Sequence, residues 1–308
     1  MKAPSVAIVI VTYNRRAMLQ NTLHACLAQG VEAHIYVVNN ASTDGTREYL
    51  DDFAQEHPQV TVTHMPTNTG GAGGFAQGMA QAFEAGHEWL WLMDDDVMPT
   101  PDGLTTLLQH AKSIGRPCCL YPAKRCADGR LFDFEYKISR KTLRRWRVSS
   151  LPALGADALV PSNSGNFEGA LVHHAVIEKI GLPDSRFFIC WDDAFWGLKA
   201  AEHFDCYYLN HVCMVKQLDK ERLHLGKRAL LSSSLFSRFH FLRNYWEVMR
   251  YLRDGKSLSV LAYGRYAWEF LRAAALTALL ERNPRGTCKL WCALQQGMTR
   301  RFQPWEAA

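Results

Sequence analysis

The chain has 308 residues, of which 48% are hydrophobic and 21% are charged. This composition is that of an ordinary globular protein with a substantial core, and no low-complexity tract or internal repeat interrupts it. The net charge of +5 is uneven, because residues 219–308 hold 16 Lys or Arg against 7 Asp or Glu, a net +9, and the rest carries −4. A basic C-terminal third favours an anionic surface or substrate, and both membrane lipid and nucleic acid are candidates on charge alone.

The N-terminal run Val6–Val11 is too short and too β-branched for a secretory signal. The nine cysteines are scattered, and no second pair accompanies Cys288 and Cys292 to make a zinc site. We therefore expect free thiols in a reducing compartment and a cytoplasmic protein.

The first third of the chain alternates strand and helix patterns. Val6–Val11 is apolar throughout, as in a strand buried on both faces. The expected elements that follow are a helix over Ala17–Gln29, a strand over Ala33–Val38, a helix over Thr46–Glu56 and a strand over Val60–His64. This order predicts a parallel, nucleotide-binding sheet.

A glycine-rich stretch, Asn68–Phe75, precedes an amphipathic helix that is expected to end at Ala85. Glycines let the backbone approach a ligand closely, and a helix N-terminus favours an anion. A plain flexible loop is the alternative. No Gly-Lys-Ser/Thr follows, so the stretch is not a Walker loop.

Trp89–Asp96 runs from apolar residues straight into Asp94, Asp95 and Asp96. Buried strands do not hold ionised carboxylates, so these three belong at the C-terminal end, where open α/β sheets bind ligands. Asp94 and Asp96 leave the same side of an extended backbone. Two such carboxylates beside a nucleotide diphosphate predict a Mg²⁺ or Mn²⁺ site, and an acidic turn is the alternative.

Phe187–Asp193 repeats the pattern of an apolar run followed by carboxylates. Asp192 or Asp193 can cap a helix over Ala194–Glu202, and one of them can also act as a general base. An earlier strand is expected over Asn166–Val172. His211 directly follows a predicted strand over Cys206–Leu209, and by itself such a histidine is more often structural than a metal ligand.

From Ser232 onward apolar residues recur at helix spacing, and no charge-free run reaches the length of a membrane span. We expect these helices to cover the core, to lie at a membrane interface, or both.

Taken together, the motifs resemble the inverting GT-A glycosyltransferases of family 2, and within it the bacterial galactofuranosyl- and rhamnosyltransferases. The segments that carry the resemblance are Val9–Arg15, Val37–Thr46, Asn68–Phe75, Leu92–Asp96, Trp191–Asp193 and Phe239–Asn244. The resemblance implies an α/β, Rossmann-like GT-A fold with a mostly parallel central sheet and a helical C-terminal extension. It places a catalytic domain at residues 1–225, with a nucleotide-sugar half to about 115 and an acceptor half after it, and a membrane-associating helical region at 226–308.

The resemblance also implies a role for each matching residue. The donor site would be formed by Thr12, Tyr13, Arg15, Asn39, Asn68, Gly70, Gly71, Gly74, Asp94 and Asp95. Asn39 stands where most members have an aspartate. A divalent cofactor, Mn²⁺ or Mg²⁺, would be held by Asp94, Asp96 and His211. Asp193 would be the catalytic base, and Trp191 and Asp192 would bind the acceptor.

The implied reaction is an inverting transfer of galactofuranose from UDP-galactofuranose, or of rhamnose from dTDP-rhamnose, to a lipid-linked glycan. Such a protein would serve cell-surface polysaccharide or O-antigen synthesis, peripherally at the inner face of the membrane, without a nucleic-acid partner and with a homo-oligomer left open. A nucleotidylyltransferase would need a Gly-rich basic loop after the first strand, where Thr12–Arg15 stands. A non-catalytic nucleotide-sugar sensor would not need Asp193 placed as a base.

Overall fold

The computed structural model describes residues 5–132, 135–148, 155, 157–218, 222–225, 228–231 and 234–305. Residues 1–4 lie outside this set, as do residues 226 and 227, which directly follow the expected end of the catalytic domain at residue 225. The strands are β1 Val6–Thr12, β2 His34–Asn39, β3 Val60–His64, β4 Trp89–Asp94, β5 Val97–Pro99, β6 Cys118–Cys126, β7 Tyr136–Ile138, β8 Arg145–Arg147, β9 Leu159–Pro161, β10 Leu171–His173, β11 Asp205–Lys216, β12 Arg222–Leu225 and β13 Arg228–Leu231.

The α-helices are α1 Arg16–Leu27, α2 Thr46–Glu56, α3 Gly70–Glu84, α4 Gly103–Ile114, α5 His174–Ile180, α6 Asp192–Ala200, α7 Leu235–Asp254, α8 Leu261–Ala275 and α9 Pro284–Thr299. A 3₁₀ turn, η1 Ser185–Phe187, precedes α6, and a π-helical turn, η2 Leu276–Leu280, extends α8.

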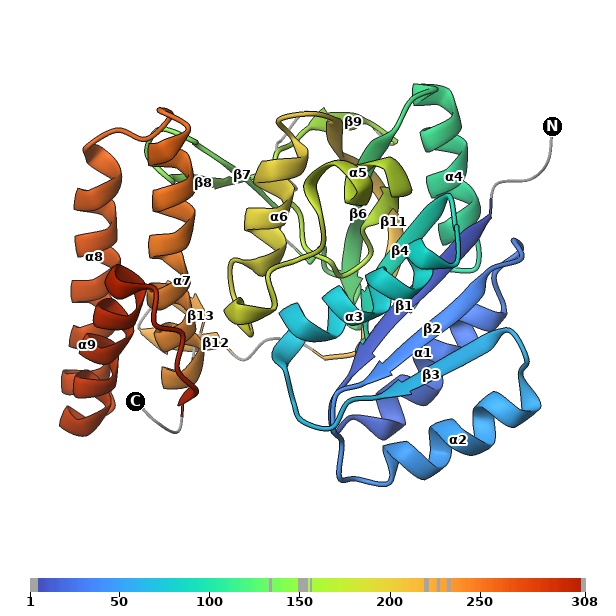
Figure 1. Cartoon of the computed structure of the whole chain (residues 1–308), viewed down its shortest axis with the longest axis horizontal. Helices are drawn as coiled ribbons and strands as arrows, with labels where there is room; N and C mark the ends of the chain where they lie inside the picture. The colour runs from blue at the N-terminus through green and yellow to red at the C-terminus, as the bar shows by residue number, and fades with distance from the viewer. Residues whose placement is uncertain are drawn as a thin grey trace.

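One large sheet organises the molecule, with the strand order β3-β2-β1-β4-β10-β6-β11-β5 and β9 paired to β11. β1 runs parallel to β2 and β4, whereas β10 is antiparallel to both β4 and β6. Val11 lies opposite Asp94 in the register of β1 and β4, so the carboxyl ends of these two strands meet at one edge (Figure 1). The expected parallel β-α-β-α-β unit is confirmed.

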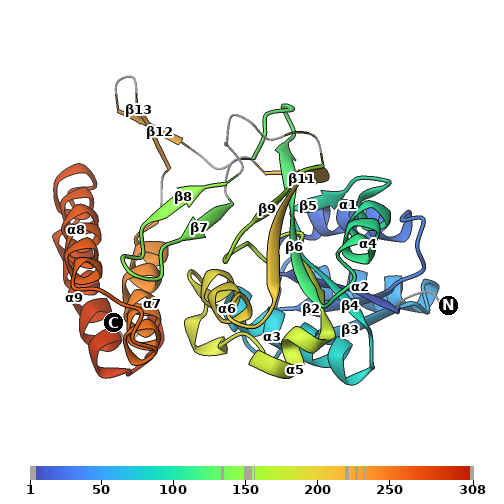
Figure 2. The same cartoon turned by 90° about the horizontal axis from the view of Figure 1, so that it is seen from above.

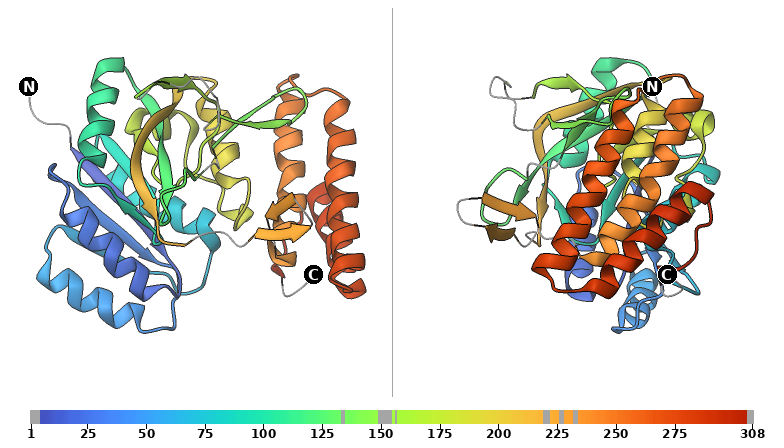
Figure 3. Two further views of the ribbon diagram at one scale, coloured as in Figure 1. Left: turned by 180° about the vertical axis from the view of Figure 1, so that it is seen from behind. Right: turned by 90° about the vertical axis from the view of Figure 1, so that its left-hand side faces the viewer.

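Alternate residues of β1 enter different cores, as the two-residue period of a strand requires. Ile8 and Ile10 pack with side chains from α1, α2 and α4, and Val9 and Val11 pack with side chains from α3 and α6. The view from behind shows α1 and α2 on the face of the sheet opposite to α3 (Figure 3). Helices on both faces explain why β1 is apolar along its whole length.

The C-terminal helices α7, α8 and α9 stand together beyond α6, at the end of the molecule away from β3 (Figures 1 and 2). A third core joins them to the segment around α6, with Phe187 and Trp191 packed among residues such as Phe239. The side-chain amide of Asn244 on α7 donates hydrogen bonds to the carbonyls of Phe187, Ile189 and Cys190, each at 2.9 Å. Thus α7 fixes the loop that leads into α6. No helix in the described part of the chain is both long and apolar enough to cross a membrane.

Three elements differ from the expected ones. α3 begins at Gly70, so the glycines form its first turns rather than a loop before it. Of the expected strand Asn166–Val172, only Leu171 and Val172 lie in a strand, β10, which ends one residue later at His173. β11 continues past Leu209 as far as Lys216, with register shifts near Val212 and Met214. All three differences bear on the site.

Candidate active site

Asp95 ties the carboxyl end of β4 to the segment that follows β1. Its side chain accepts hydrogen bonds from the hydroxyl of Thr12 at 2.8 Å, the backbone N–H of Tyr13 at 3.2 Å and the Arg15 guanidinium at 3.0 Å. Burial raises the pKa of Asp95, and the Arg15 charge and the Thr12 hydrogen bond oppose that rise. The chain after β1 is therefore held beside the end of β4, where Tyr13 and Arg15 reach a cavity.

Asp94, Asp96 and Glu168 form a carboxylate cluster, whose nearest oxygens all lie within 4.8 Å of one another. Burial, then the charges of Glu168 and Asp96, raise the pKa of Asp94 well above its usual range. The backbone N–H of Leu92 in β4 donates to the Ala170 carbonyl, and the backbone N–H of Gly169 donates to the Leu92 carbonyl. These two hydrogen bonds hold Glu168 beside the end of β4. Lys216, at the end of β11, places its ammonium 3.0 Å from Asp96 and 2.9 Å from Glu168.

His211 lies outside this cluster, and its predicted part in the metal site is corrected. Its ring contacts Asp157 at 2.6 Å and lies 3.8 Å from Asp102. The expected strand ended at Leu209, which would have put His211 in the loop beside the carboxylates. Because β11 runs on to Lys216, His211 sits five residues before the edge, about 16 Å along an extended strand.

Asn39 is the last residue of β2 and Asn40 is the first residue after it, and their side chains have different partners. Asn39 accepts a hydrogen bond from the backbone N–H of Ser42 at 3.0 Å and contacts the His64 ring at 2.9 Å, and it is not among the cavity-lining residues. Asn40 does line the cavity, and its side chain donates to the Gly70 carbonyl at 2.9 Å. Sequence reasoning missed Asn40, although the adjacent pair at a strand end was a visible signal.

The glycines of α3 divide into two groups. Gly70 and Gly71 line the cavity together with Asn68, whose side chain accepts the Gly70 N–H at 2.8 Å. Gly70 has φ of +71°, and a Cβ there would lie 2.1 Å from the Phe188 carbonyl oxygen. Gly74 is buried away from the cavity, where a Cβ would meet Val11 at 2.5 Å. Gly74 thus allows α3 to pack on β1, and its predicted donor contact is not supported by its position.

The Trp191–Asp193 segment begins α6, and none of its three residues lines the cavity. The Trp191 ring is buried against Tyr245 and Phe241, at centroid distances of 5.1 and 5.5 Å, and does not line the cavity. A Cβ on Gly71 would lie 4.0 Å from Asp192 Oδ2, so Asp192 faces the N-terminus of α3. The helical position of Asp193 lets its side chain accept the Ala194 N–H at 2.6 Å.

Both carboxyl groups of this segment are perturbed by burial. Burial raises the pKa of Asp192 to about 6. Burial, followed by the Asp192 charge and weaker contributions from Glu135 and Glu168, raises the pKa of Asp193 well above its usual range. A carboxylate whose pKa is raised toward neutrality is a stronger base than an exposed one.

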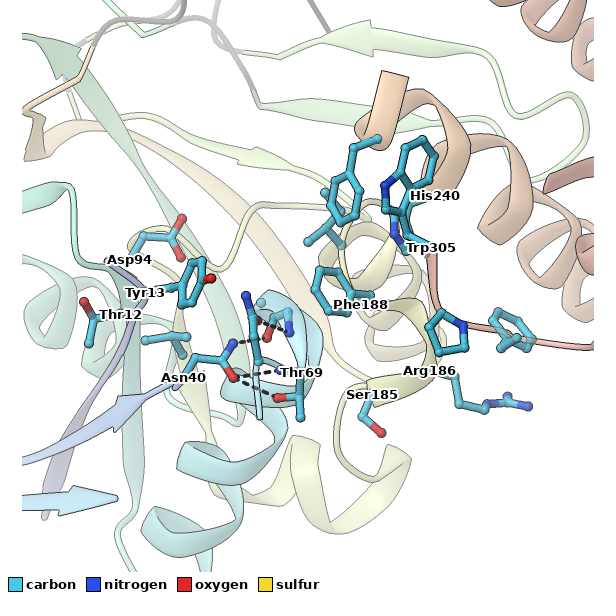
Figure 4. A pocket seen from close by; sticks show the side chains of 18 of the residues that line it. Thr12, Tyr13, Asn40, Thr69, Asp94, Ser185, Arg186, Phe188, His240 and Trp305 are labelled. Atoms are coloured by element: carbon cyan, nitrogen blue, oxygen red, sulfur yellow. Dashed lines mark hydrogen bonds between the residues drawn. The ribbon is translucent and has the colours of Figure 1, made fainter. Parts of the chain in front are cut away.

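The cavity encloses about 1020 Å³ between the sheet edge and the C-terminal part of the chain. Figure 4 shows Thr12, Tyr13 and Asp94 on one wall, and Phe188, His240 and Trp305 on the other. The second wall comes from the loop before α6, from α7 and from the residues after α9: Ser185, Arg186, Phe188, Ile189, Phe236, His240, Arg243, Phe302, Gln303, Pro304 and Trp305. Burial, then the charge of Arg243, lowers the pKa of His240 to about 3, so its ring stays neutral.

Residues 7–154 match the family described as Glycosyl transferase family 2. This part of the chain is therefore a glycosyltransferase family 2 domain. The chain is 32% identical over 199 residues to "Galactofuranosyltransferase GlfT1" of Mycolicibacterium smegmatis, covering 61% of the chain and 62% of that protein. It is 30% identical over 149 residues to "Undecaprenyl-phosphate mannosyltransferase" of Micrococcus luteus, covering 48% of the chain and 59% of that protein. The chain therefore spans about three fifths of the length of these relatives.

Among solved structures, the chain is similar to the mannosyltransferase PcManGT from Pyrobaculum calidifontis in complex with GDP-Man and Mn²⁺. The TM-score is 0.52 at 20% identity, and the match covers 99% of this chain and 78% of that one. At this identity the similarity concerns the fold alone, and it confirms the expected GT-A fold with its helical C-terminal extension.

The expected divalent ion can be tested against the residues present. The cluster of Asp94, Asp96 and Glu168 has the oxygens and the spacing for an ion. However, Asp96 and Glu168 already accept hydrogen bonds from the Lys216 ammonium, and Asp96 also lies 3.3 Å from the Arg15 guanidinium. An ion at the cluster would have to displace Lys216 or sit beside its positive charge. With Lys216 in this position, Asp96 and Glu168 are not free to hold an ion.

Proposed function

We propose that this chain is an inverting glycosyltransferase that moves a sugar from a nucleoside diphosphate to a hydroxyl group of an acceptor glycan. The observation that carries the proposal is one cavity with two different walls. One wall is the carboxyl edge of β1 and β4, and the other comes from the loop before α6, from α7 and from the residues after α9. Asp192 and Asp193 do not line the cavity, but Asp192 faces Gly71, which does, and the charge of Glu168 contributes to the raised pKa of Asp193. Glycosyl transfer needs a donor site and a base on opposite sides of one anomeric carbon.

The donor would lie along the first wall. The N-terminus of α3 offers backbone N–H groups to a diphosphate, and Gly70 and Gly71 present no side chain to block it. Tyr13 is 44% exposed and offers its ring to the nucleotide base. Thr12, Asp94 and Asp95 border the same space. Asn40, the first residue after β2, also borders this space, and the donor contact of Asn39 stays a prediction.

Asp193 is the proposed base. It would take the proton of the acceptor hydroxyl as that oxygen bonds to the anomeric carbon and the bond from that carbon to the diphosphate oxygen breaks. The nucleoside diphosphate leaves with the electron pair of that bond. Because the hydroxyl attacks from the face opposite to the leaving group, the configuration at the anomeric carbon inverts. Asp192, beside Gly71, would bind the acceptor, and the buried Trp191 would support α6 from behind.

Galactofuranose from UDP-galactofuranose is the proposed sugar, because the similarity to a protein named as a galactofuranosyltransferase extends over 61% of the chain. Rhamnose from dTDP-rhamnose is the second candidate. A lipid-linked acceptor is proposed because another relative is named for undecaprenyl phosphate. We further propose the division into a catalytic part, residues 1–225, and a helical part, residues 226–308.

The helical part would bind the membrane surface. Its large exposed apolar side chains are Val260, Leu261, Tyr263, Trp268, Leu271, Leu279, Leu280, Trp291 and Met298, on or beside α8, η2 and α9. Apolar side chains inserted between lipids, with the net +9 of residues 219–308 facing anionic headgroups, would hold the protein at the inner leaflet. The same face could instead join two copies of the chain.

Nucleotide binding tests the proposal. Calorimetric titration with UDP, dTDP and GDP should reveal a preference for UDP, and a preference for dTDP would move the sugar to rhamnose. Tyr13→Ala should weaken UDP binding about tenfold, because stacking of a base on an aromatic ring is worth about 1–3 kcal/mol. Tyr263→Ala on α8, a tyrosine of similar exposure, is the matched control and should leave the affinity unchanged. If none of the three nucleotides binds, the donor site is refuted.

A further inference from the structure

The place of a metal ion among the carboxylates is taken by a side chain of the protein itself. The Lys216 ammonium lies 3.0 Å from Asp96 Oδ1 and 2.9 Å from Glu168 Oε1, and the Lys216 side chain is only 3% exposed. It also lies 5.3 Å from the centre of the Phe132 ring, as in a cation–π contact. Two carboxylates and an aromatic face make a site built for one monovalent cation.

The backbone fixes this arrangement. Lys216 pairs with Val97 in the register of β11 and β5, one residue after Asp96. The backbone N–H of Gln217 donates to the Asp96 carbonyl at 2.8 Å. Strand pairing thus delivers Lys216 to the cluster, whereas the histidine that the resemblance implied as a ligand, His211, lies five residues earlier in β11.

Arg15 supplies a second cation from the opposite side. Its Nη1 lies 3.0 Å from Asp95 and 3.3 Å from Asp96, and its side chain is 43% exposed and borders the cavity. Asp95 and Asp96 therefore hold an arginine toward the cavity. Asp94 is the cluster member for which the described residues provide no ion pair, and it lines the cavity.

We propose that Lys216 and Arg15 are the built-in cations of this site, so that it binds a nucleoside diphosphate without a divalent metal. Lys216 would neutralise Asp96 and Glu168 beneath the cavity, and Arg15 would face the diphosphate. This inference rests on the proposed function for its ligand, but the occupation of the carboxylate cluster by Lys216 can be tested without a nucleotide.

The first experiment is calorimetric titration of the full chain with UDP, once in EDTA and once with excess Mn²⁺. The inference predicts dissociation constants that agree within about twofold. UDP binding at least tenfold tighter with Mn²⁺ would overturn it and leave the proposed function standing.

The second experiment measures metal uptake by the protein alone, from the electron paramagnetic resonance signal of free Mn²⁺. Wild type should leave the signal unchanged, whereas Lys216→Ala, which frees Asp96 and Glu168, should bind Mn²⁺ and gain thermal stability from it. The control is Lys199→Ala, which removes a partly buried lysine whose ammonium donates to the Ile180 carbonyl at 2.9 Å, and it should create no Mn²⁺ site. Uptake of one Mn²⁺ per wild-type chain would overturn the inference. If UDP binds neither in EDTA nor with Mn²⁺, the proposed function fails, and the Mn²⁺ uptake experiment still decides the role of Lys216. If Lys216→Ala does not fold, Lys216→Arg is the variant that keeps the charge.

Discussion

Replacing Gly70 by alanine is expected to destabilise the protein and to disturb the donor site. Gly70 has φ of +71° at the start of α3, and an added Cβ would lie 2.1 Å from the carbonyl oxygen of Phe188 and 2.6 Å from its carbonyl carbon. The neighbouring N–H of Ala72 donates to that same carbonyl at 3.0 Å. The alanine methyl group would therefore push apart two backbone segments that form opposite walls of the cavity.

The expected loss in the free energy of unfolding for Gly70→Ala has two parts. A non-glycine residue in the left-handed region costs about 1–2 kcal/mol, and an overpacked contact costs about 1–3 kcal/mol. The free energy of unfolding should fall by about 2–5 kcal/mol. With an unfolding entropy of about 2.1 cal/mol/K per residue, the Tm of a chain of this length should fall by about 3–8 °C.

Gly86→Ala is the matched control. Gly86 follows α3 with φ of +79°, but no heavy atom lies within 4 Å of the position of its Cβ. Only the conformational cost applies there, so the Tm should fall by about 1.5–3 °C. Differential scanning calorimetry compares the two variants, and titration with UDP should show weaker binding for Gly70→Ala alone. Equal Tm shifts for the two variants would refute the reasoning that Gly70 permits a close backbone contact.

Three further predictions concern the base, the pH dependence and the membrane. Asp193→Asn should lower kcat by about 10²–10⁴-fold with a nearly unchanged Kd for UDP; loss of UDP binding, measured by calorimetry, would count against its role as a base. Because burial raises the pKa of Asp192 to about 6, the folded chain binds that proton more tightly than the unfolded chain, so this group should lower the free energy of unfolding as pH rises from about 4 to 6. Urea denaturation across this range should show a shallower decline for Asp192→Asn, and an identical pH dependence would contradict the raised pKa. Trp268→Ser should reduce cosedimentation with anionic vesicles, whereas Trp146→Ser, an exposed tryptophan on β8, should not; equal losses would argue against binding through α8.

The part of the fold that could be predicted from the sequence is the part that depends on short-range patterns of apolar and polar residues. The apolar run of β1 and the carboxylates at the end of β4 each depend on a few neighbouring residues, and the structure agrees with both. Asp94, Asp95, Thr12 and Tyr13 meet because parallel neighbouring strands end at one edge, a rule that needs no knowledge of distant contacts.

The rest depends on contacts between distant segments. Glu168 reaches the cluster through a short segment before β10 that has no strand pattern of its own. The choice between His211 and Lys216 depends on where β11 ends and on the register shifts along it, which single-sequence patterns do not record. The wall that contains His240 and Trp305 forms only because α7 and the C-terminal residues fold back on the loop before α6.

The most direct test of the account is the release of UDP from UDP-galactofuranose by the purified chain, measured with a lipid-linked glycan acceptor in anionic vesicles. The account predicts acceptor-dependent release by wild type, and release lower by about 10²–10⁴-fold for Asp193→Asn. A second donor, dTDP-rhamnose, is measured in parallel. Failure of wild type to turn over either donor, or equal rates for wild type and Asp193→Asn, would contradict the proposal that this cavity is a glycosyltransferase active site.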